Sequence, residues 1–217
     1  MKGPRLVGDP ADAAVLASVV RHLREGGLAA IPTETVYGFG CAIQEEALAK
    51  LQQLKGRGED KPFLILVPGV EAVSRLDWTP LARELAGVFW PGALTLVLRD
   101  GAQSFPRGVR SPKGTVAVRQ SPNPVARSVV DRLMEPIVST SANPPGGPPA
   151  LSAREALDVA GSLGAGDDFW VLDGGTLSPS KPSTVVDCSE EEPVVLRAGS
   201  IPLNRLRCVL PDLRGPA

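Results

Sequence analysis

Short apolar runs rich in β-branched residues alternate with helical patterns along the whole chain, and this alternation restricts the possible fold more than any other feature. The expected strands are residues 28–31, 63–67, 94–98, 115–119, 137–140, 170–172, 184–187 and 194–197. The longest apolar run, 63–67, is strand-sized and far below the roughly 18 residues that a membrane helix needs. Strands that alternate with helices are typical of α/β domains, so the sequence predicts a mixed sheet flanked by helices.

Capping residues and prolines mark the expected helix starts. These are Asp9-Pro10, Thr79-Pro80, Asn123-Pro124, residue 45, and Ser152, which has Glu155 at capping-box spacing. Proline suits the first helical position because the amide hydrogen it lacks has no partner there. The stretch NPPGGPPA at 143–150 is interpreted as a functional loop inside one domain. We therefore expect a single domain over residues 1–217, with a core of about 10–208 and a short C-terminal tail.

Composition excludes several classes of protein. The net charge of −1 does not imply bulk attraction to nucleic acid. A single histidine, His22, argues against a Ser-His-Asp triad and against a histidine-rich zinc site, and we expect it to have a packing or helix-surface role. Three cysteines without CxxC spacing indicate reduced thiols, which is typical of a cytoplasmic protein with no membrane segment or signal peptide.

Polar residues follow two of the expected apolar segments at turns where α/β sheets place ligands. Thr33, Glu34 and Thr35 follow the strand 28–31, and they either hold an amino acid or only cap the turn. Lys55 and Arg57 close a helix, where they either converge on one anion or serve the helix dipole and solvent. No P-loop motif is present, so a phosphate site would need another device.

Two further segments carry groups that suit an anion. Residues 139–143 (STSAN) place hydroxyls and an amide before a Gly- and Pro-rich loop, which is either a phosphate nest or ordinary loop chemistry. Arg119 ends one expected strand, Ser183 precedes another, and Arg197 ends a third. Several such residues at strand ends favour a polyanion pocket over isolated surface charges.

In this order, these segments resemble the YrdC/TsaC family of threonylcarbamoyl-AMP synthases. The motifs are PTETVYGFG, KGR followed by KP, FWPGALTLVL, VAVR, STSAN, PSTVVD and LRAG, and they extend from Pro32 to Gly199. Each motif is weak alone, but seven in register are specific. The resemblance implies the short, single-domain form, with a twisted YrdC-like mixed sheet and an open concave ligand pocket.

The resemblance implies a nucleotidyltransferase that joins L-threonine, bicarbonate and ATP into threonylcarbamoyl-AMP and releases pyrophosphate. A downstream transferase complex would then move the threonylcarbamoyl group to the tRNA adenosine 3′ of the anticodon, and direct contact with tRNA is a further option. Mg²⁺ is expected as the counter-ion of ATP and not as a protein-ligated metal. Two anions must be brought together, so a site rich in cations and backbone amides suits this reaction.

Roles carry over by position. The catalytic group would be Lys55, Arg57, Ser141 and Asn143; the threonine-binding group Thr33, Arg119 and Ser183; the nucleotide-binding group Lys55, Arg57, Lys61, Thr115, Ser139, Ser141, Asn143 and Arg197. Lys61 and Pro149 stand where some relatives have asparagine and serine.

Two other functions compete with this interpretation. One is a non-catalytic RNA-binding module, whose contacts would be Arg107, Arg110, Lys113 and Arg119; the acidic balance of the chain argues against it. The other is the carbamoyl-adenylate chemistry of hydrogenase-maturation proteins. This chain has no acylphosphatase-like or zinc-finger segment, which argues against that role.

Overall fold

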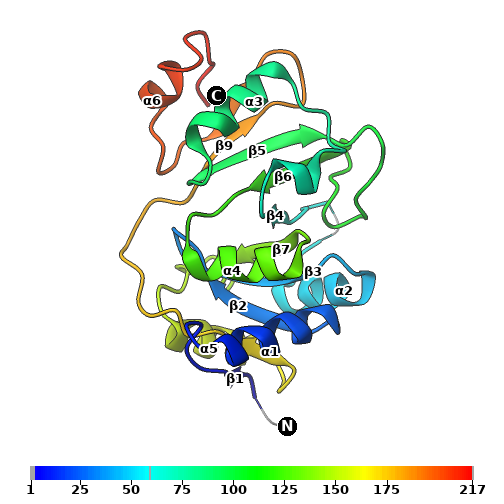
Figure 1. Cartoon of the computed structure of the whole chain (residues 1–217), viewed down its shortest axis with the longest axis vertical. Coiled ribbons are helices and arrows are strands. Elements are labelled where there is room, and N and C mark those ends of the chain that lie inside the picture. Colours follow the sequence, from blue (N-terminus) through cyan, green and yellow to red (C-terminus); the bar gives the residue numbers. More distant parts are fainter. Residues whose placement is uncertain (1–2, 59, 217) are drawn as a thin grey trace.

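The computed structural model describes residues 3–58 and 60–216, and within them one ten-stranded mixed sheet carries helices on both faces (Figure 1). Its strands are β1 (Arg5–Leu6), β2 (Leu28–Pro32), β3 (Tyr37–Ala42), β4 (Leu64–Leu66), β5 (Leu94–Arg99), β6 (Thr115–Arg119), β7 (Ile137–Ser141), β8 (Phe169–Val171), β9 (Thr184–Asp187) and β10 (Val194–Arg197). Their order in the sheet is β1-β8-β2-β3-β7-β4-β6-β5-β9-β10. The predicted single-domain α/β fold with a mixed sheet is confirmed.

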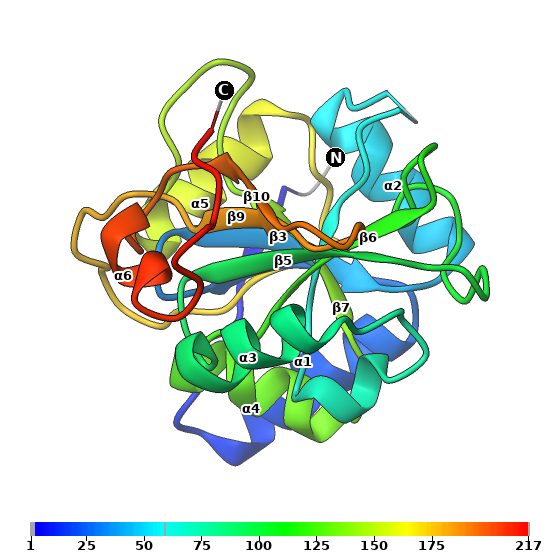
Figure 2. The same ribbon diagram turned by 90° about the horizontal axis from the view of Figure 1, so that it is seen from above.

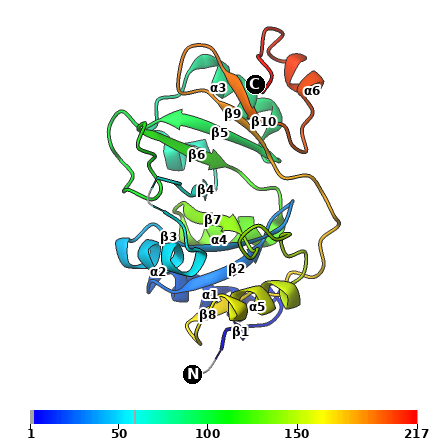
Figure 3. The ribbon, with the colours of Figure 1, turned by 180° about the vertical axis from the view of Figure 1, so that it is seen from behind.

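Helices cover the two faces of the sheet unequally. They are α1 (Ala13–Arg24), α2 (Glu45–Lys55), α3 (Pro80–Phe89), α4 (Pro124–Leu133), α5 (Ala153–Ser162) and α6 (Leu203–Arg207), with a 3-10 turn η1 (Val70–Val73). Helices α1 and α4 pack together on one face, while α2 and α5 lie on the other (Figures 1 and 3). Seen from above, α3 lies on the side of α1 and α4, against β5 (Figure 2).

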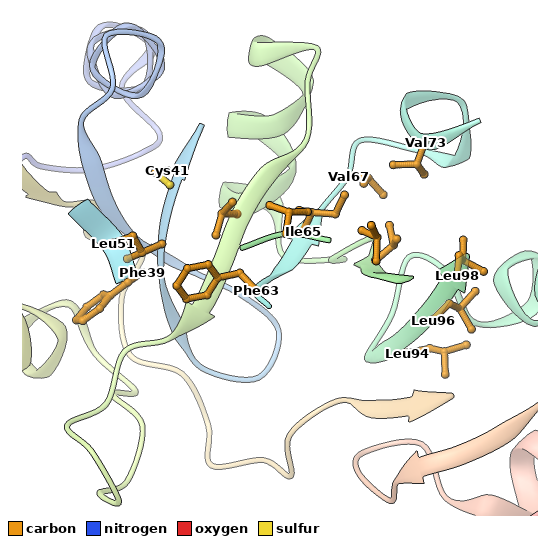
Figure 4. Packing of buried hydrophobic residues seen from close by; sticks show 14 of the residues in the cluster. Phe39, Cys41, Leu51, Phe63, Ile65, Val67, Val73, Leu94, Leu96 and Leu98 are labelled. Carbon is orange, nitrogen blue, oxygen red and sulfur yellow. The ribbon is translucent and has the colours of Figure 1, made fainter. Parts of the chain in front are cut away.

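Strand register determines which side chains enter the core and which face away from it. Ile65 pairs with Val118, and Val118 pairs with Leu96, so one apolar row crosses β4, β6 and β5. Figure 4 shows Leu94, Leu96 and Leu98 projecting together from β5. Because alternate residues of a strand face opposite sides, Thr95 must face away from this row.

Two strands were not expected from the sequence, and β3 is the more important of them. It lies between β2 and β7 near the middle of the sheet. A Cβ atom at Gly38 would be 2.6 Å from the Ser139 hydroxyl oxygen, and one at Gly40 would be 2.5 Å from the Val138 carbonyl oxygen. These glycines permit close approach of β7, and they also weaken the apolar pattern by which a strand is recognised.

The expected helix starts are correct at three capping residues and wrong at a fourth. Thr79, Asn123 and Ser152 each accept a backbone N–H of the helix that follows. Pro10, in contrast, does not begin α1. The Asp9 side chain and carbonyl close a turn over residues 9–12, and the helix begins only after Asp12, whose carboxylate accepts the Ala14 amide at 2.7 Å.

His22 has the packing role expected of it. Its ring stacks on that of Trp170 with centroids 4.1 Å apart, and its Nε2 lies 3.1 Å from the Leu28 carbonyl oxygen. Burial lowers the pKa of this imidazole, so the ring packs as a neutral group at neutral pH. Within the described part of the chain, no helix has both the length and the apolarity required to cross a bilayer.

Candidate functional site

A cavity of about 520 Å³ opens where the turn after β2, the end of β7 and the strands β4, β6, β5 and β9 meet. The chain from β8 to β9 crosses from one end of the sheet to the other and adds lining residues to the cavity (Figure 1). The described lining residues are Thr33, Thr35, Val36, Gly38, Arg57, Pro62, Leu64, Thr95, Ala117, Arg119, Ser139, Thr140, Ser141, Asn143, Pro149, Ser180, Pro182, Ser183, Val185 and Arg197. They include three arginines and no carboxylate.

Most of the candidate residues from the sequence meet at this cavity. Those in its lining are Thr33, Arg57, Arg119, Ser139, Ser141, Asn143, Ser183 and Arg197. The lining does not include Lys55, Lys61 or Thr115. The hydroxyl of Thr115 is hydrogen-bonded to that of Ser111 at 2.8 Å. Thr115 lies at the opposite end of β6 from Arg119, about 13 Å away along the strand.

Arg119 is the most deeply buried cation of the cavity. Its side chain is 6% exposed, and its Nη1 lies 3.3 Å from Glu34 Oε1, while the other oxygen of that carboxylate, Oε2, accepts a hydrogen bond from Ser121. Burial lowers the pKa of Arg119, whereas the Glu34 charge raises it and the Arg197 charge lowers it. The Arg119 Nε has no hydrogen-bond partner within the described residues. The guanidinium is therefore not saturated by the protein, and Arg119 is one of the residues that line the cavity.

Arg197 lies next to a pair of buried hydroxyls. Its Nε and Nη2 donate to the Ser183 carbonyl oxygen at 3.1 and 2.9 Å, and Nη2 also donates to the Ser183 hydroxyl at 3.1 Å. The Ser183 hydroxyl lies 2.9 Å from that of Thr95. Arg197 and Arg119 influence each other electrostatically, so this end of the cavity is suited to an anion.

The turn after β2 supplies further hydroxyls. Thr33 is buried, and its hydroxyl donates to the Val36 carbonyl oxygen at 2.7 Å and lies 3.3 Å from the hydroxyl of Thr35. The Thr33 hydroxyl thus closes the turn, as one of the two interpretations of the sequence required. Its oxygen also accepts the backbone N–H groups of Thr35 and Val36, both at 3.3 Å, so Thr33 lines the cavity as a residue whose hydroxyl is engaged in the turn.

Lys55 organises the loop at the opposite end of the cavity. Its ammonium donates to the carbonyl oxygens of Ser141 and Asn143 at 3.0 and 2.7 Å and to the Asn143 side-chain oxygen at 3.1 Å. The Ser141 hydroxyl donates to that same side-chain oxygen. Burial, followed by the charge of Arg57, lowers the pKa of Lys55 to about 8. All three ammonium hydrogens of Lys55 are therefore used to hold the strand–loop junction.

Arg57 is fixed by the chain that follows it. Its Nε donates to the Lys61 carbonyl oxygen at 2.6 Å and its Nη2 to the Pro62 carbonyl oxygen at 2.8 Å, while the guanidinium lies 4.9 Å above the centre of the Phe63 ring. Its Nη1 group makes neither bond, and Arg57 is one of the residues that line the cavity. The Lys61 side chain is exposed, so Lys61 contributes its backbone to the site.

Several lining residues were not singled out as candidates, and Thr95 is the clearest. It stands in the strand LTLVL, where one hydroxyl among leucines and a valine gives no motif. Its position opposite the leucine face was the only available signal. Ala117, Val185 and Leu64 complete an apolar wall, and their residue types alone do not distinguish a cavity wall from core.

The described residues contain no group of three or more His, Cys, Asp or Glu side chains that would hold a metal ion. A cavity of hydroxyls, an amide and arginines fits a magnesium ion that is bound by phosphates and water. A separate hollow of about 600 Å³ lies at the starts of α1 and α4. Asp9 and Asp173 line it, and no described cation does, so its charge does not suit phosphates.

The cavity therefore has two cationic ends joined by hydroxyls. One end combines Arg119, Arg197 and Ser183; the other combines Arg57 with the Ser141–Asn143 loop that Lys55 holds. Two anions bound at these ends would lie in one cavity with their repulsion reduced by the guanidinium groups. Such an arrangement favours a reaction that joins two anionic substrates.

Comparison with known proteins gives independent information. The family model Sua5_yciO_yrdC, described as "Telomere recombination", matches residues 21–199. A threonylcarbamoyl-AMP synthase of Pyrococcus abyssi is 37% identical over 88% of this chain and 56% of its own length. A putative threonylcarbamoyl-AMP synthase of Mycobacterium tuberculosis is 36% identical over 90% of this chain and 88% of its own length.

Solved structures show the same similarity. The P. abyssi Sua5 structure, a complex with L-threonine, superposes with a TM-score of 0.85 at 34% identity, over 94% of this chain and 59% of that one. Escherichia coli YciO superposes with a TM-score of 0.79 at 26% identity, over 95% of this chain and 100% of that one. The chain thus spans little more than half the length of the P. abyssi protein.

Proposed function

Because this chain belongs to the Sua5/YciO/YrdC family, we propose that it is an L-threonylcarbamoyladenylate synthase. The reaction would consume L-threonine, bicarbonate and ATP, and it would release threonylcarbamoyl-AMP, pyrophosphate and water. The observation that carries the proposal is the single cavity with a cationic group at each end and no carboxylate in its described lining. The relatives named as synthases favour this function over a non-catalytic RNA-binding module.

The amino-acid end of the cavity is assigned to threonine. Arg119 would bind the threonine carboxylate, with Ser183 assisting, and Thr33 would contact the amino acid from the cavity wall. The complex of P. abyssi Sua5 with L-threonine supports an amino-acid substrate for this fold. Glu34 lies behind Arg119 and keeps that guanidinium in place.

The opposite end is assigned to the phosphates of ATP. Arg57, Ser141 and Asn143 would hold them, and Lys55 would act through the loop that it anchors. Ser139, and Arg197 from the amino-acid end of the cavity, would extend the nucleotide contacts. Lys61 and Thr115 would contact the nucleotide from outside the described cavity lining. Mg²⁺ bound to ATP would supply further neutralisation of phosphate charge.

The chemistry that these residues must assist is a displacement. The threonine nitrogen forms a bond to the bicarbonate carbon with loss of water, which gives a carbamate. A carbamate oxygen then attacks the α-phosphorus of ATP while pyrophosphate leaves. The described lining offers no histidine or carboxylate as a base, so positioning and charge neutralisation by the arginines are its contribution. We further propose that the product passes to a transferase that modifies tRNA, and that the chain acts as one domain with a core of about 10–208.

Pyrophosphate release with each amino acid in turn tests the proposal. With ATP and bicarbonate present, we expect release with L-threonine and much slower release with L-serine, glycine or L-valine. Omission of bicarbonate should abolish it. Release that is independent of any amino acid would contradict the proposal, and equal rates with serine would overturn the choice of threonine.

A further inference from the structure

Thr95 places a hydroxyl in the cavity wall, and none of the substrate contacts proposed above involves this hydroxyl. The residue lies in β5 between Leu94 and Leu96, which enter the core, and it faces the cavity. Both Thr95 and its partner Ser183 are 2% exposed. Two buried hydroxyls 2.9 Å apart form one hydrogen bond between them.

This pair of hydroxyls has one O–H hydrogen that neither of them uses. Each hydroxyl has one hydrogen, and a single hydrogen is used between the two oxygens. The Ser183 oxygen already accepts a hydrogen bond from Arg197, so the remaining hydroxyl hydrogen has no acceptor in the direction of that guanidinium. Within residues 3–58 and 60–216, neither hydroxyl has any other acceptor. The remaining O–H is therefore available to a ligand in the cavity that both residues line.

The neighbouring strands identify the chemistry of that ligand. Thr95 pairs with Val185 of β9, and since Leu96 pairs with Val118, Thr95 lies opposite Arg119 of β6. The Arg119 guanidinium, which lines the cavity, and the spare O–H thus belong to adjacent positions of the same sheet face. Two donors side by side, one of them charged, match the two oxygens of a carboxylate.

We propose that Thr95 and Ser183 form a two-hydroxyl relay whose single free O–H binds one carboxylate oxygen of the amino-acid substrate, beside Arg119. This inference rests on the proposed function and adds Thr95 as a further substrate-positioning residue. Thr95 takes part in either direction of the relay. It donates to the carboxylate itself, or it donates to Ser183 and thereby turns the Ser183 O–H toward the carboxylate.

Titration calorimetry with L-threonine tests the relay. Thr95→Val keeps the shape and removes the hydroxyl, so it should weaken binding by about tenfold or more, the usual loss for a hydrogen bond to a charged group. Thr95→Ser restores the hydroxyl and should recover most of this loss. Thr176→Val, at an exposed position outside the cavity, should bind like the unaltered protein. Unchanged binding by Thr95→Val would overturn the relay.

Two analogues determine which atom of the substrate is bound. L-2-aminobutyrate keeps the carboxylate and lacks the β-hydroxyl, so the loss caused by Thr95→Val should persist with it. L-threonine amide lacks the carboxylate, so the loss should disappear. A loss that disappears with 2-aminobutyrate would mean that Thr95 contacts the β-hydroxyl, and it would overturn the carboxylate assignment.

A double variant separates the relay from two independent contacts. If both hydroxyls serve one free O–H, Thr95→Val with Ser183→Ala should weaken threonine binding about as much as either single change. Additive losses would contradict the relay. Failure of the unaltered protein to bind threonine would instead contradict the proposed function. Thermal unfolding checks that each variant is folded, and Thr95→Ala replaces Thr95→Val if the valine variant is not.

Discussion

Glu34 lies outside the described cavity lining and holds the side chain of Arg119, which lines the cavity. Its carboxylate lies 3.3 Å from Arg119 and accepts a hydrogen bond from Ser121, whose hydroxyl also accepts the Asn123 amide. The Asn123 side chain donates to the Thr33 carbonyl oxygen. The turn after β2, the end of β6 and the start of α4 are therefore joined by one polar network, with Arg119 as its cationic member.

Glu34→Gln should raise the KM for threonine by about tenfold and leave kcat nearly unchanged, because Arg119 loses the charge that orients its guanidinium. Steady-state kinetics at varied threonine concentration measure this. Glu45→Gln, on the exposed first turn of α2, is the matched control. Tighter threonine binding in Glu34→Gln would show instead that Glu34 competes with the substrate for Arg119.

The lowered pKa of Lys55 predicts that catalysis depends on pH. Its pKa is lowered to about 8, so the ammonium loses its proton as the pH rises through this value, and one of its three hydrogen bonds to the Ser141–Asn143 loop is lost with it. We expect kcat/KM for ATP to fall above pH 8. Lys55→Arg should move this fall to higher pH, because guanidinium stays protonated. An identical alkaline limb in both proteins would contradict the assignment.

For folding, the same shift has the opposite consequence. Lys55 binds its proton more weakly in the folded state than in the unfolded chain, whose lysine pKa is 10.5. Between about pH 8 and that value the unfolded state binds more protons, so the contribution of Lys55 to stability increases with pH. Loss of activity above pH 8 is therefore expected without unfolding caused by this residue, and circular dichroism at pH 9 separates the two.

Among the elements, the segment after β10 illustrates a close backbone contact that the cavity depends on. A Cβ atom at Gly199 would be 2.2 Å from the Pro182 carbonyl oxygen and 2.5 Å from the Ser183 carbonyl carbon. The Ser200 amide also donates to the Pro182 carbonyl oxygen at 2.8 Å. This contact places Arg197 against Ser183, and the RAG motif owes its glycine to it.

Gly199→Ala should lower the free energy of unfolding by about 1–3 kcal/mol, because the backbone must shift to admit the methyl group. It should also weaken threonine binding, since Ser183 moves with that backbone. Gly87→Ala is the control: nothing lies within 4 Å of its Cβ position in α3, and the change should stabilise the helix by about 0.5–1 kcal/mol. Denaturant unfolding measures both; equal effects would contradict this account.

The sequence is sufficient to predict elements whose signals are local. Thr79 and Asn123 cap their helices as expected, and β5 and β6 are recognisable from their own residues. It is insufficient for β3, because the reason for Gly38 and Gly40 is the proximity of β7, about a hundred residues later in the chain. Pro10 was misplaced since two acidic residues compete to cap the same chain segment.

Local sequence signals predict only some of the residues of the candidate site. Polar residues at strand ends identify Arg119, Ser183 and Arg197, which the structure brings to one cavity. They do not reveal that Lys55 faces a loop instead of the cavity, because its bonds are made to residues 86 and 88 positions away. Thr95 was missed because its role depends on strand pairing, which the sequence does not give.

On the scale of the whole molecule, the sheet order brings the two ends of the cavity together. Leu66 of β4 pairs with Ile137 at the start of β7 and with Arg119 at the end of β6, so the loop after β7 lies at the other edge from Arg119. Both border the cavity, which extends between these edges. The crossing from β8 to β9 then adds Ser180 and Ser183 from the far end of the sheet. Both proposed substrate ends are therefore bordered by strands of one sheet.

Two separate ends predict separable defects. Arg119→Ala should weaken threonine binding by about a hundredfold with little change in ATP binding, and Arg57→Ala should do the reverse, because each removes a charged contact to one substrate. Calorimetric titration of each variant with each substrate measures this. Equal losses of both substrates in both variants would contradict the division of the cavity.

This one cavity is proposed to join threonine, bicarbonate and ATP. Incubation of the protein with ATP, Mg²⁺, L-threonine and ¹³C-bicarbonate, followed by mass spectrometry of the nucleotides, tests it most directly. We predict an adenylate that contains one threonine and one ¹³C carbon, formed with an equal amount of pyrophosphate. An adenylate without the ¹³C carbon, or pyrophosphate release without any such adenylate, would contradict the account.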